Sequence, residues 1–130
     1  MNDRIGQRVG VAVAAALDKK ANGLEVLEVA ELTSLADYFI ICSGSSERQA
    51  VAIADGIEEK LRVDLGTKPR LVEGLNPGRW VVMDYGDFIV HVFTDDCRAF
   101  YGLERLWGDA PDVTERFAGA SNGRSNATGA

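Results

Sequence analysis

A strand–glycine–serine–helix unit between Ile41 and Gln49 has the residue pattern of an anion-binding turn. An apolar run over residues 38–42 is broken by Gly44, and Ser46 with Gln49 makes an S-x-x-Q capping box at a helix start. A glycine at such a turn lets an anion approach the backbone, and the free N–H groups of a helix N-terminus attract phosphate. The unit could therefore hold a phosphorylated ligand.

This unit resembles the phosphate-binding turn of the nucleotidyltransferase fold, whose chemistry also needs two carboxylates. Those carboxylates alternate on the next strands and hold divalent metal near a triphosphate. Here the next strand supplies only Glu73, while Asp84 and Asp87 stand three residues apart across a turn and need not face one ion. Glycines between a strand and a helix are far more often structural. A nucleotidyltransferase-like enzyme that uses Gly44, Ser45 and a carboxylate from Glu73 or Asp84 remains the alternative function.

Hydrolytic and metal chemistry find less support in the sequence. His91 is the only histidine and lies among apolar residues in the middle of a strand, where packing is the commoner role. Cys42 and Cys97 are far apart and form no C-x-x-C pair, so neither a zinc site nor a redox motif is indicated. We therefore expect no metal, no cofactor and no catalysis.

A hairpin between Trp80 and Phe93 carries the residues best suited to binding. Two strongly patterned strands, residues 80–84 and 88–93, flank a Tyr-Gly-Asp turn. Trp80, Met83, Asp84 and Tyr85 combine aromatic, thioether and carboxylate groups, a mixture typical of the anchors in protein interfaces. The alternative, that Trp80, Met83 and Tyr85 are ordinary core residues, stays open from the pattern alone.

The remaining periodicity predicts the elements that position this hairpin. Apolar residues recur at helical spacing or alternate along the chain, and glycine, proline and capping residues mark the ends. The expected elements are a helix over 3–20, strands over 24–32 and 38–42, a helix over 46–65, an edge strand over 69–73, the hairpin, and a helical segment from Thr94 or Asp95 hinged at Gly102. The order α-β-β-α-β-β-β-α predicts an α+β fold, a mixed sheet of about five strands flanked by helices.

Composition bounds the domain organisation and the location of the chain. Its 130 residues fit one domain, expected over 1–111, and residues 112–130 are expected to form a disordered tail because the sequence from Ala118 onward is small and polar. No apolar run reaches the ~20 residues of a membrane helix, and the N-terminus lacks a signal-peptide pattern. We expect a cytoplasmic protein without membrane contact.

The charge balance narrows the class of partner. The net charge is −6, from 20 acidic and 14 basic residues, and no basic run is present. Because nucleic-acid binding depends on lysine and arginine set against phosphates, we expect little direct nucleic-acid binding. An acidic chain would attract a basic protein, although the charge could equally serve solubility alone.

Four segments together resemble the Iojap-like ribosomal silencing factor family. They are ADYFIICSGSSERQ (36–49), EG (73–74), WVVMDYGDFIVHVF (80–93) and RAFYGLERLWGDAP (98–111). The hairpin pattern combined with Y-x-L-E-x-L-W downstream is specific, and the likeness covers about residues 3–111. The resemblance also implies a degenerate nucleotidyltransferase fold, consistent with the missing acidic pair.

What the resemblance implies for function is a translational repressor. Members bind the basic large-subunit ribosomal protein uL14 on the face that meets the small subunit, and so block subunit joining when nutrients are scarce. Transferred position by position, the contact residues are Trp80, Met83, Asp84, Tyr85 and Gly86, with Tyr101 as a weaker candidate. A ribosome-assembly partner is a further alternative. The resemblance and the open edge near Pro69 also leave room for a homodimer.

Overall fold

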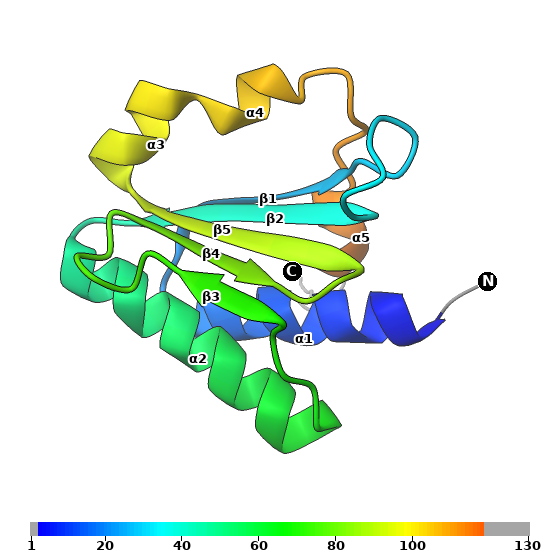
Figure 1. The fold of residues 1–130 in the computed structure, drawn as a ribbon, viewed down its shortest axis with the longest axis horizontal. Coiled ribbons are helices and arrows are strands. Elements are labelled where there is room, and N and C mark those ends of the chain that lie inside the picture. Colours follow the sequence, from blue (N-terminus) through cyan, green and yellow to red (C-terminus); the bar gives the residue numbers. More distant parts are fainter. Residues whose placement is uncertain (1–2, 119–130) are drawn as a thin grey trace, which may run out of the picture.

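The computed structural model describes residues 3–118, which form a mixed five-stranded sheet with helices on both faces (Figure 1). The strands are β1 (Asn22–Glu28), β2 (Tyr38–Gly44), β3 (Leu71–Glu73), β4 (Trp80–Asp84) and β5 (Phe88–Thr94). Their order across the sheet is β1-β2-β5-β4-β3; β2 and β5 are parallel, and the other neighbours are antiparallel. The predicted α+β class and the five-stranded mixed sheet are confirmed.

The helices divide between the two faces of this sheet. Two long helices, α1 (Asp3–Asp18) and α2 (Glu47–Leu65), lie across one face, and the short helices α3 (Asp95–Tyr101) and α4 (Leu103–Leu106) stand over the other (Figure 1). A last turn of helix, α5 (Thr114–Phe117), packs beside β1 and α1. The hinge expected at Gly102 is confirmed, because this glycine is left-handed (φ 57°) between α3 and α4.

Side-chain alternation along the strands produces one apolar core on each face. The larger core lies under α1 and α2 and includes Ile40, Ile57, Phe88, Val90 and Val92, all fully buried. The smaller core lies under α3 and α4, and its buried members are Leu27, Val29, Ala36, Phe39, Ile41, Phe93 and Leu103. Because both faces are covered over β2 and β5, these two strands read as nearly continuous apolar runs.

The helix start at Ser46 follows the expected capping pattern with one difference. The Ser46 hydroxyl accepts a hydrogen bond from the Gln49 backbone N–H at 3.0 Å, as the motif predicts. The Gln49 side chain, however, accepts from the backbone N–H of Ser45 at 2.7 Å rather than from that of Ser46. The reciprocal pair is therefore shifted by one residue, and it closes the turn between β2 and α2.

Removing this cap gives a first prediction. Ser46→Ala should lower the free energy of unfolding by about 1 kcal/mol, because the Gln49 N–H loses its partner. Urea denaturation monitored by circular dichroism measures the change. Ser45→Ala is the matched control: it removes a neighbouring exposed hydroxyl that bonds only the Gln49 side chain, and should cost less than half as much. Equal losses for both variants would count against the capping role.

Three expected boundaries were wrong by a few residues, each for a local reason. The first helix ends at Asp18 rather than residue 20, because Lys20 turns the chain with a positive φ of 64°. The first strand ends at Glu28 rather than residue 32, because the next N–H, that of Val29, bonds the Asp37 carbonyl across the following loop. The edge strand begins at Leu71 rather than at Pro69, which has no N–H to donate.

The packed part of the chain extends past the expected boundary at residue 111. Val113 is buried in the larger core, and its N–H bonds the Val26 carbonyl at 2.8 Å. The Thr114 hydroxyl in turn accepts from the Val26 N–H at 2.9 Å. Residues 112–118 are therefore part of the fold, which corrects the expected start of a disordered tail. The rest of that expected tail, residues 119–130, lies outside the described residues.

Candidate functional site

The hairpin of β4 and β5 presents different residues to the two faces of the sheet. Along β4, Val81 and Met83 face α1 and α2, while Trp80 and Asp84 face the side of α3 and α4. Met83 is 1% exposed, so its side chain belongs to the larger core. The sequence-predicted contact residues are thus divided by the sheet.

Tyr85 lies in the turn but also belongs to the core. Its ring stacks on Phe88 with 4.9 Å between ring centroids, and the residue is 5% exposed. Burial, with a smaller contribution from the Glu58 carboxylate, raises the pKa of Tyr85 above its ordinary value. Met83 and Tyr85 therefore support the hairpin from beneath, and in this conformation they offer little surface to a partner.

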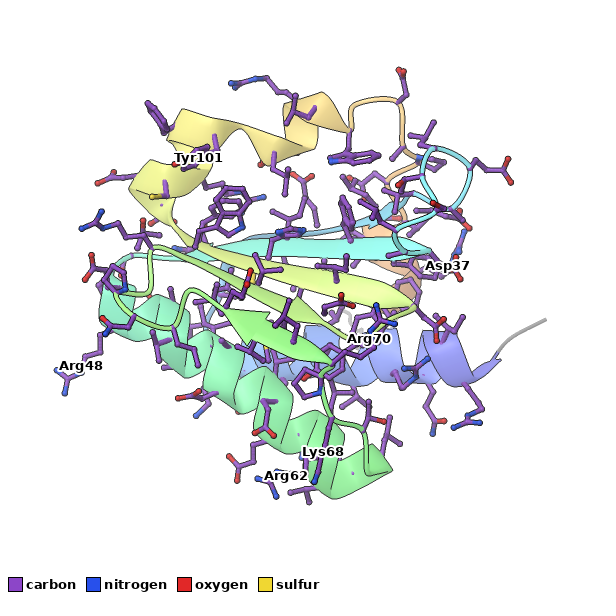
Figure 2. The ribbon with its side chains drawn as sticks, viewed as in Figure 1. Asp37, Arg48, Arg62, Lys68, Arg70 and Tyr101 are labelled. Carbon is purple, nitrogen blue, oxygen red and sulfur yellow. The ribbon has the colours of Figure 1, made fainter. Side chains whose placement is uncertain are left out.

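Trp80 and Tyr101 form the aromatic part of the site. Their ring centroids lie 4.9 Å apart, and Trp80 also stacks on the buried Phe93 at 4.8 Å. Trp80 is half-buried at the start of β4, and Tyr101, at the end of α3, is 50% exposed (Figure 2). The structure thus brings together Trp80 and Tyr101, which are 21 positions apart in the sequence.

His91 fixes the indole of Trp80 from the neighbouring strand. The Trp80 indole N–H donates to His91 Nδ1 at 3.2 Å, so the imidazole is neutral with its proton on Nε2. Burial lowers the pKa of His91 to about 4. The Nε2 atom is buried without a hydrogen-bond partner among the described residues. His91 is therefore a support for Trp80 rather than an exposed acid or base.

Asp84 and Gly86 shape the turn at the other end of β4. One Asp84 carboxylate oxygen accepts from the Gly86 N–H at 2.8 Å, and the other lies 3.4 Å from the Arg70 guanidinium. Gly86 adopts a φ of +89°, which favours glycine. Asp84 keeps about a quarter of its side chain exposed, while Arg70 is largely exposed at the start of β3 (Figure 2). The carboxylate is thus held in place but remains accessible.

The glycine–serine turn at the end of β2 lies apart from both carboxylates that nucleotidyl transfer could use. Glu73 is on β3, three strands away across the sheet, which separates them by ~14 Å at ~4.8 Å per strand. Asp84 pairs with Ile89 of β5, whereas Gly44 pairs with Thr94, five residues further along the same strand. At ~3.3 Å per residue, this offset alone separates Asp84 from Gly44 by ~17 Å along the strand direction. A Cβ on Gly44 would lie 3.0 Å from the Ala50 nitrogen, so close packing of strand and helix explains the glycine. Arg48 extends away from the turn (Figure 2). Among residues 3–118, no group of three or more His, Cys, Asp or Glu could hold a metal ion.

Sequence reasoning missed Arg98, the best-connected polar residue on this side of the sheet. Its guanidinium contacts Glu104 at 2.8 Å and Glu25 at 3.6 Å, and the side chain is only 13% exposed. No local pattern signals this role, because two of its other partners, Asn22 and Ser43, lie 76 and 55 positions away. The structure alone identifies it.

Several large apolar side chains around the site are exposed. Leu71 pairs with Asp84 across the edge of the sheet and is half exposed, and Phe100 contacts Tyr101 edge-to-face at 5.0 Å. Phe100 and Leu106 are each more than three-quarters exposed. None of the helices within residues 3–118 is long and apolar enough to cross a membrane. Phe100 therefore adds exposed apolar area directly beside Tyr101, and exposed apolar area of this kind is typical of a surface that binds a partner.

Comparisons with known proteins identify the family of this chain. Residues 2–129 match the family model described as "Ribosomal silencing factor during starvation". A ribosomal silencing factor from Halalkalibacterium halodurans is 46% identical over 103 residues, covering 79% of this chain and 87% of that protein. A more distant relative is the mouse "Mitochondrial assembly of ribosomal large subunit protein 1", 29% identical, which covers 81% of this chain and 48% of that protein.

A solved structure shares the fold at similar length. The crystal structure of protein CV0518 from Chromobacterium violaceum superposes with a TM-score of 0.78 and 35% sequence identity, covering 81% of this chain and 87% of that chain. Together the fold and the site define a small α+β domain with an exposed aromatic surface on one face of its sheet. The chain belongs to the ribosomal silencing factor family. Ribosome association and translation regulation follow from that membership.

Proposed function

We propose that this protein silences ribosomes by binding the large-subunit ribosomal protein uL14 and sterically preventing the small subunit from joining. Its action would require occupancy alone, so no catalytic step, metal or cofactor takes part. The proposal also places the protein in the cytoplasm, with the ribosomes it represses. The observation that carries it is the contact between half-buried Trp80 and exposed Tyr101, on the same face of the sheet as an accessible Asp84, in a member of a family of silencing factors.

The proposed contact surface consists of Trp80, Asp84, Gly86 and Tyr101, with Met83 and Tyr85 supporting it from the core. Trp80 and Tyr101 supply large apolar area at low entropic cost, the usual property of residues that dominate binding energy. The Trp80 N–H is already satisfied by His91, so the indole offers its ring to a partner. The Asp84 carboxylate can accept from a basic side chain of uL14, and the net charge of −6 favours the encounter.

The contribution of Asp84 gives a prediction for this surface. Asp84→Asn should weaken binding to purified uL14 by about tenfold, because it removes a charge while leaving an acceptor for the Gly86 N–H. Calorimetric titration measures the affinity. Glu59→Gln, at an exposed position of α2 over the opposite face, is the matched control and should bind like wild type. An Asp84→Asn affinity equal to that of the control would remove Asp84 from the contact surface.

Large-subunit assembly is a second candidate, supported by the name of the mouse relative. The same aromatic surface could hold the protein on an immature subunit. The two functions differ in what accumulates when the protein is depleted from cells: loss of an assembly factor leaves immature large subunits, whereas loss of a silencing factor leaves translation active during starvation. Sucrose-gradient profiles of depleted cells in rich and starved media separate them.

Self-association stays a prediction. In the described part of the chain β3 is an edge strand, and its Leu71 side chain is half exposed. An edge with unpaired backbone groups can pair with a second strand. Light scattering of the purified protein over a concentration series would detect a homodimer.

A further inference from the structure

The segment of α3 and α4, residues 95–106, carries Tyr101 and is here called the arm. Little apolar burial holds it: α3 has no buried residue, and α4 buries only Leu103. Half-buried Cys97 adds some packing against the smaller core. Apolar packing has no directional preference, and here its area is small, whereas charged hydrogen bonds are directional. Polar contacts must therefore fix how α3 is rotated over the sheet.

Arg98 supplies those polar contacts from the middle of α3. Its Nε donates to Glu104 at 2.8 Å, which links α3 to α4 across the left-handed Gly102. Its Nη1 donates to the Asn22 carbonyl at 3.2 Å and to the Ser43 hydroxyl at 3.4 Å, and its Nη2 lies 3.6 Å from Glu25. One guanidinium therefore joins α3 to α4, β1 and β2.

The backbone around Arg98 leaves space for this guanidinium. Gly23 adopts a φ of +55°, and a Cβ at this position would lie 2.8 Å from Arg98 Nη1. The absence of a side chain there lets the guanidinium reach the Asn22 carbonyl. The planar fork of arginine can bond to several elements at once, which the single ammonium group of lysine cannot reproduce.

The two carboxylates beside Arg98 have different proton affinities. Burial raises the pKa of Glu25, with Arg98 opposing. Burial also opposes ionisation of Glu104, but its backbone hydrogen bond and the Arg98 contacts outweigh that effect and lower its pKa. Glu104 is therefore the firmly ionised partner, and the link between α3 and α4 is charge-assisted.

We propose that Arg98 is the positioning residue for the aromatic contact pair: by fixing the rotation of α3 it holds Tyr101 against Trp80, and it thereby sets partner affinity without touching the partner. This inference rests on the proposed function for its affinity readout. Arg98 and Tyr101 are three residues apart in one helix, so a rotation of α3 moves both side chains together. The 4.9 Å separation of the Trp80 and Tyr101 rings depends on that rotation.

The test combines affinity for uL14 with a probe of the free protein. Arg98→Lys and Arg98→Met are each made alone and together with Tyr101→Ala, and Arg62→Met, which breaks an exposed ion pair on α2, is the control. Affinity is measured by calorimetry. In a Trp107→Phe background, the single remaining indole N–H resonance reports the surroundings of Trp80 by NMR.

The expected result is a loss of about tenfold for each Arg98 variant, the scale of one hydrogen bond to a charged group. In the Tyr101→Ala background the same substitutions should cause no further loss, since coupled residues are not additive. The Trp80 indole resonance should shift in both Arg98 variants and stay fixed in the Arg62 control.

Three results would overturn the proposal: wild-type affinity in the Arg98 variants, an equal loss with and without Tyr101, or an unchanged indole resonance in Arg98→Lys. If Arg98→Met fails to fold, Arg98→Lys decides; if both fail to fold, Arg98 is a requirement of the fold and the positioning role is rejected. Failure of the wild-type protein to bind uL14 counts against the proposed function instead. The indole resonance then still decides the role of Arg98.

Discussion

Trp80→Ala should weaken binding to uL14 by about thirtyfold or more, which corresponds to ~2 kcal/mol. The substitution removes the indole that contacts Tyr101 and Phe93 and is held by His91. Because its N–H is bonded inward, the lost energy is that of apolar and aromatic contact with the partner. Surface-immobilised uL14 with increasing concentrations of the variant measures the affinity directly.

Trp107→Ala is the matched control for this experiment. Trp107 is also half-buried on the same side of the sheet and meets Phe39 edge-to-face at 5.0 Å, but it lies outside the proposed contact surface. It should lose stability while keeping its affinity near that of wild type. Circular dichroism confirms that both variants are folded at the temperature used. Similar affinities for the two alanine variants would reject Trp80 as an anchor.

Acidification should destabilise the fold through His91. Its pKa is about 4 in the folded chain and 6.5 as an ordinary value. Above pH 6.5 neither state carries the proton, so stability is unaffected. Between pH 6.5 and 4, His91 is protonated in the unfolded chain but neutral in the folded chain, so the free energy of unfolding falls as the pH falls. The loss between pH 7 and pH 4 is about 3 kcal/mol at 1.36 kcal/mol per pKa unit.

A variant that cannot titrate isolates this effect. His91→Gln keeps an acceptor for the Trp80 N–H and has no ionisable group at these pH values. Free energies of unfolding from urea denaturation at pH 7 and pH 4 give the loss for each protein. Carboxylates contribute equally to both, so the wild type should lose about 3 kcal/mol more than the variant. Equal losses would show that His91 is protonated as readily in the folded state as in the unfolded chain.

Most of the fold could be predicted because local patterns and tertiary packing agree. The residue 46–65 helix has a cap at Ser46, an apolar stripe and a left-handed Gly66 at its end, and all three signals mark the same element. The strands of the hairpin were placed correctly because alternation and turn residues coincide. The turn of helix after Pro111 was missed, since a four-residue helix has too little periodicity to be recognised in a sequence.

The candidate site was predicted in outline but not in depth. Alternation along 80–84 places Trp80 and Asp84 on one face and Met83 on the other, yet nothing in the sequence says which face has an open area. That depends on α3 and α4 being too short to cover the whole sheet. The role of Arg98 could not be predicted, because an arginine in a short helix gives no sign of a partner 76 residues away.

Sedimentation of purified large and small ribosomal subunits, with and without the protein, shows whether the protein silences ribosomes by steric exclusion. Under conditions that favour joining, wild-type protein should keep the subunits apart and migrate with the large subunit. Trp80→Ala should permit joining at the same concentration. Subunits that join fully while the wild-type protein remains bound to the large subunit would contradict silencing by steric exclusion.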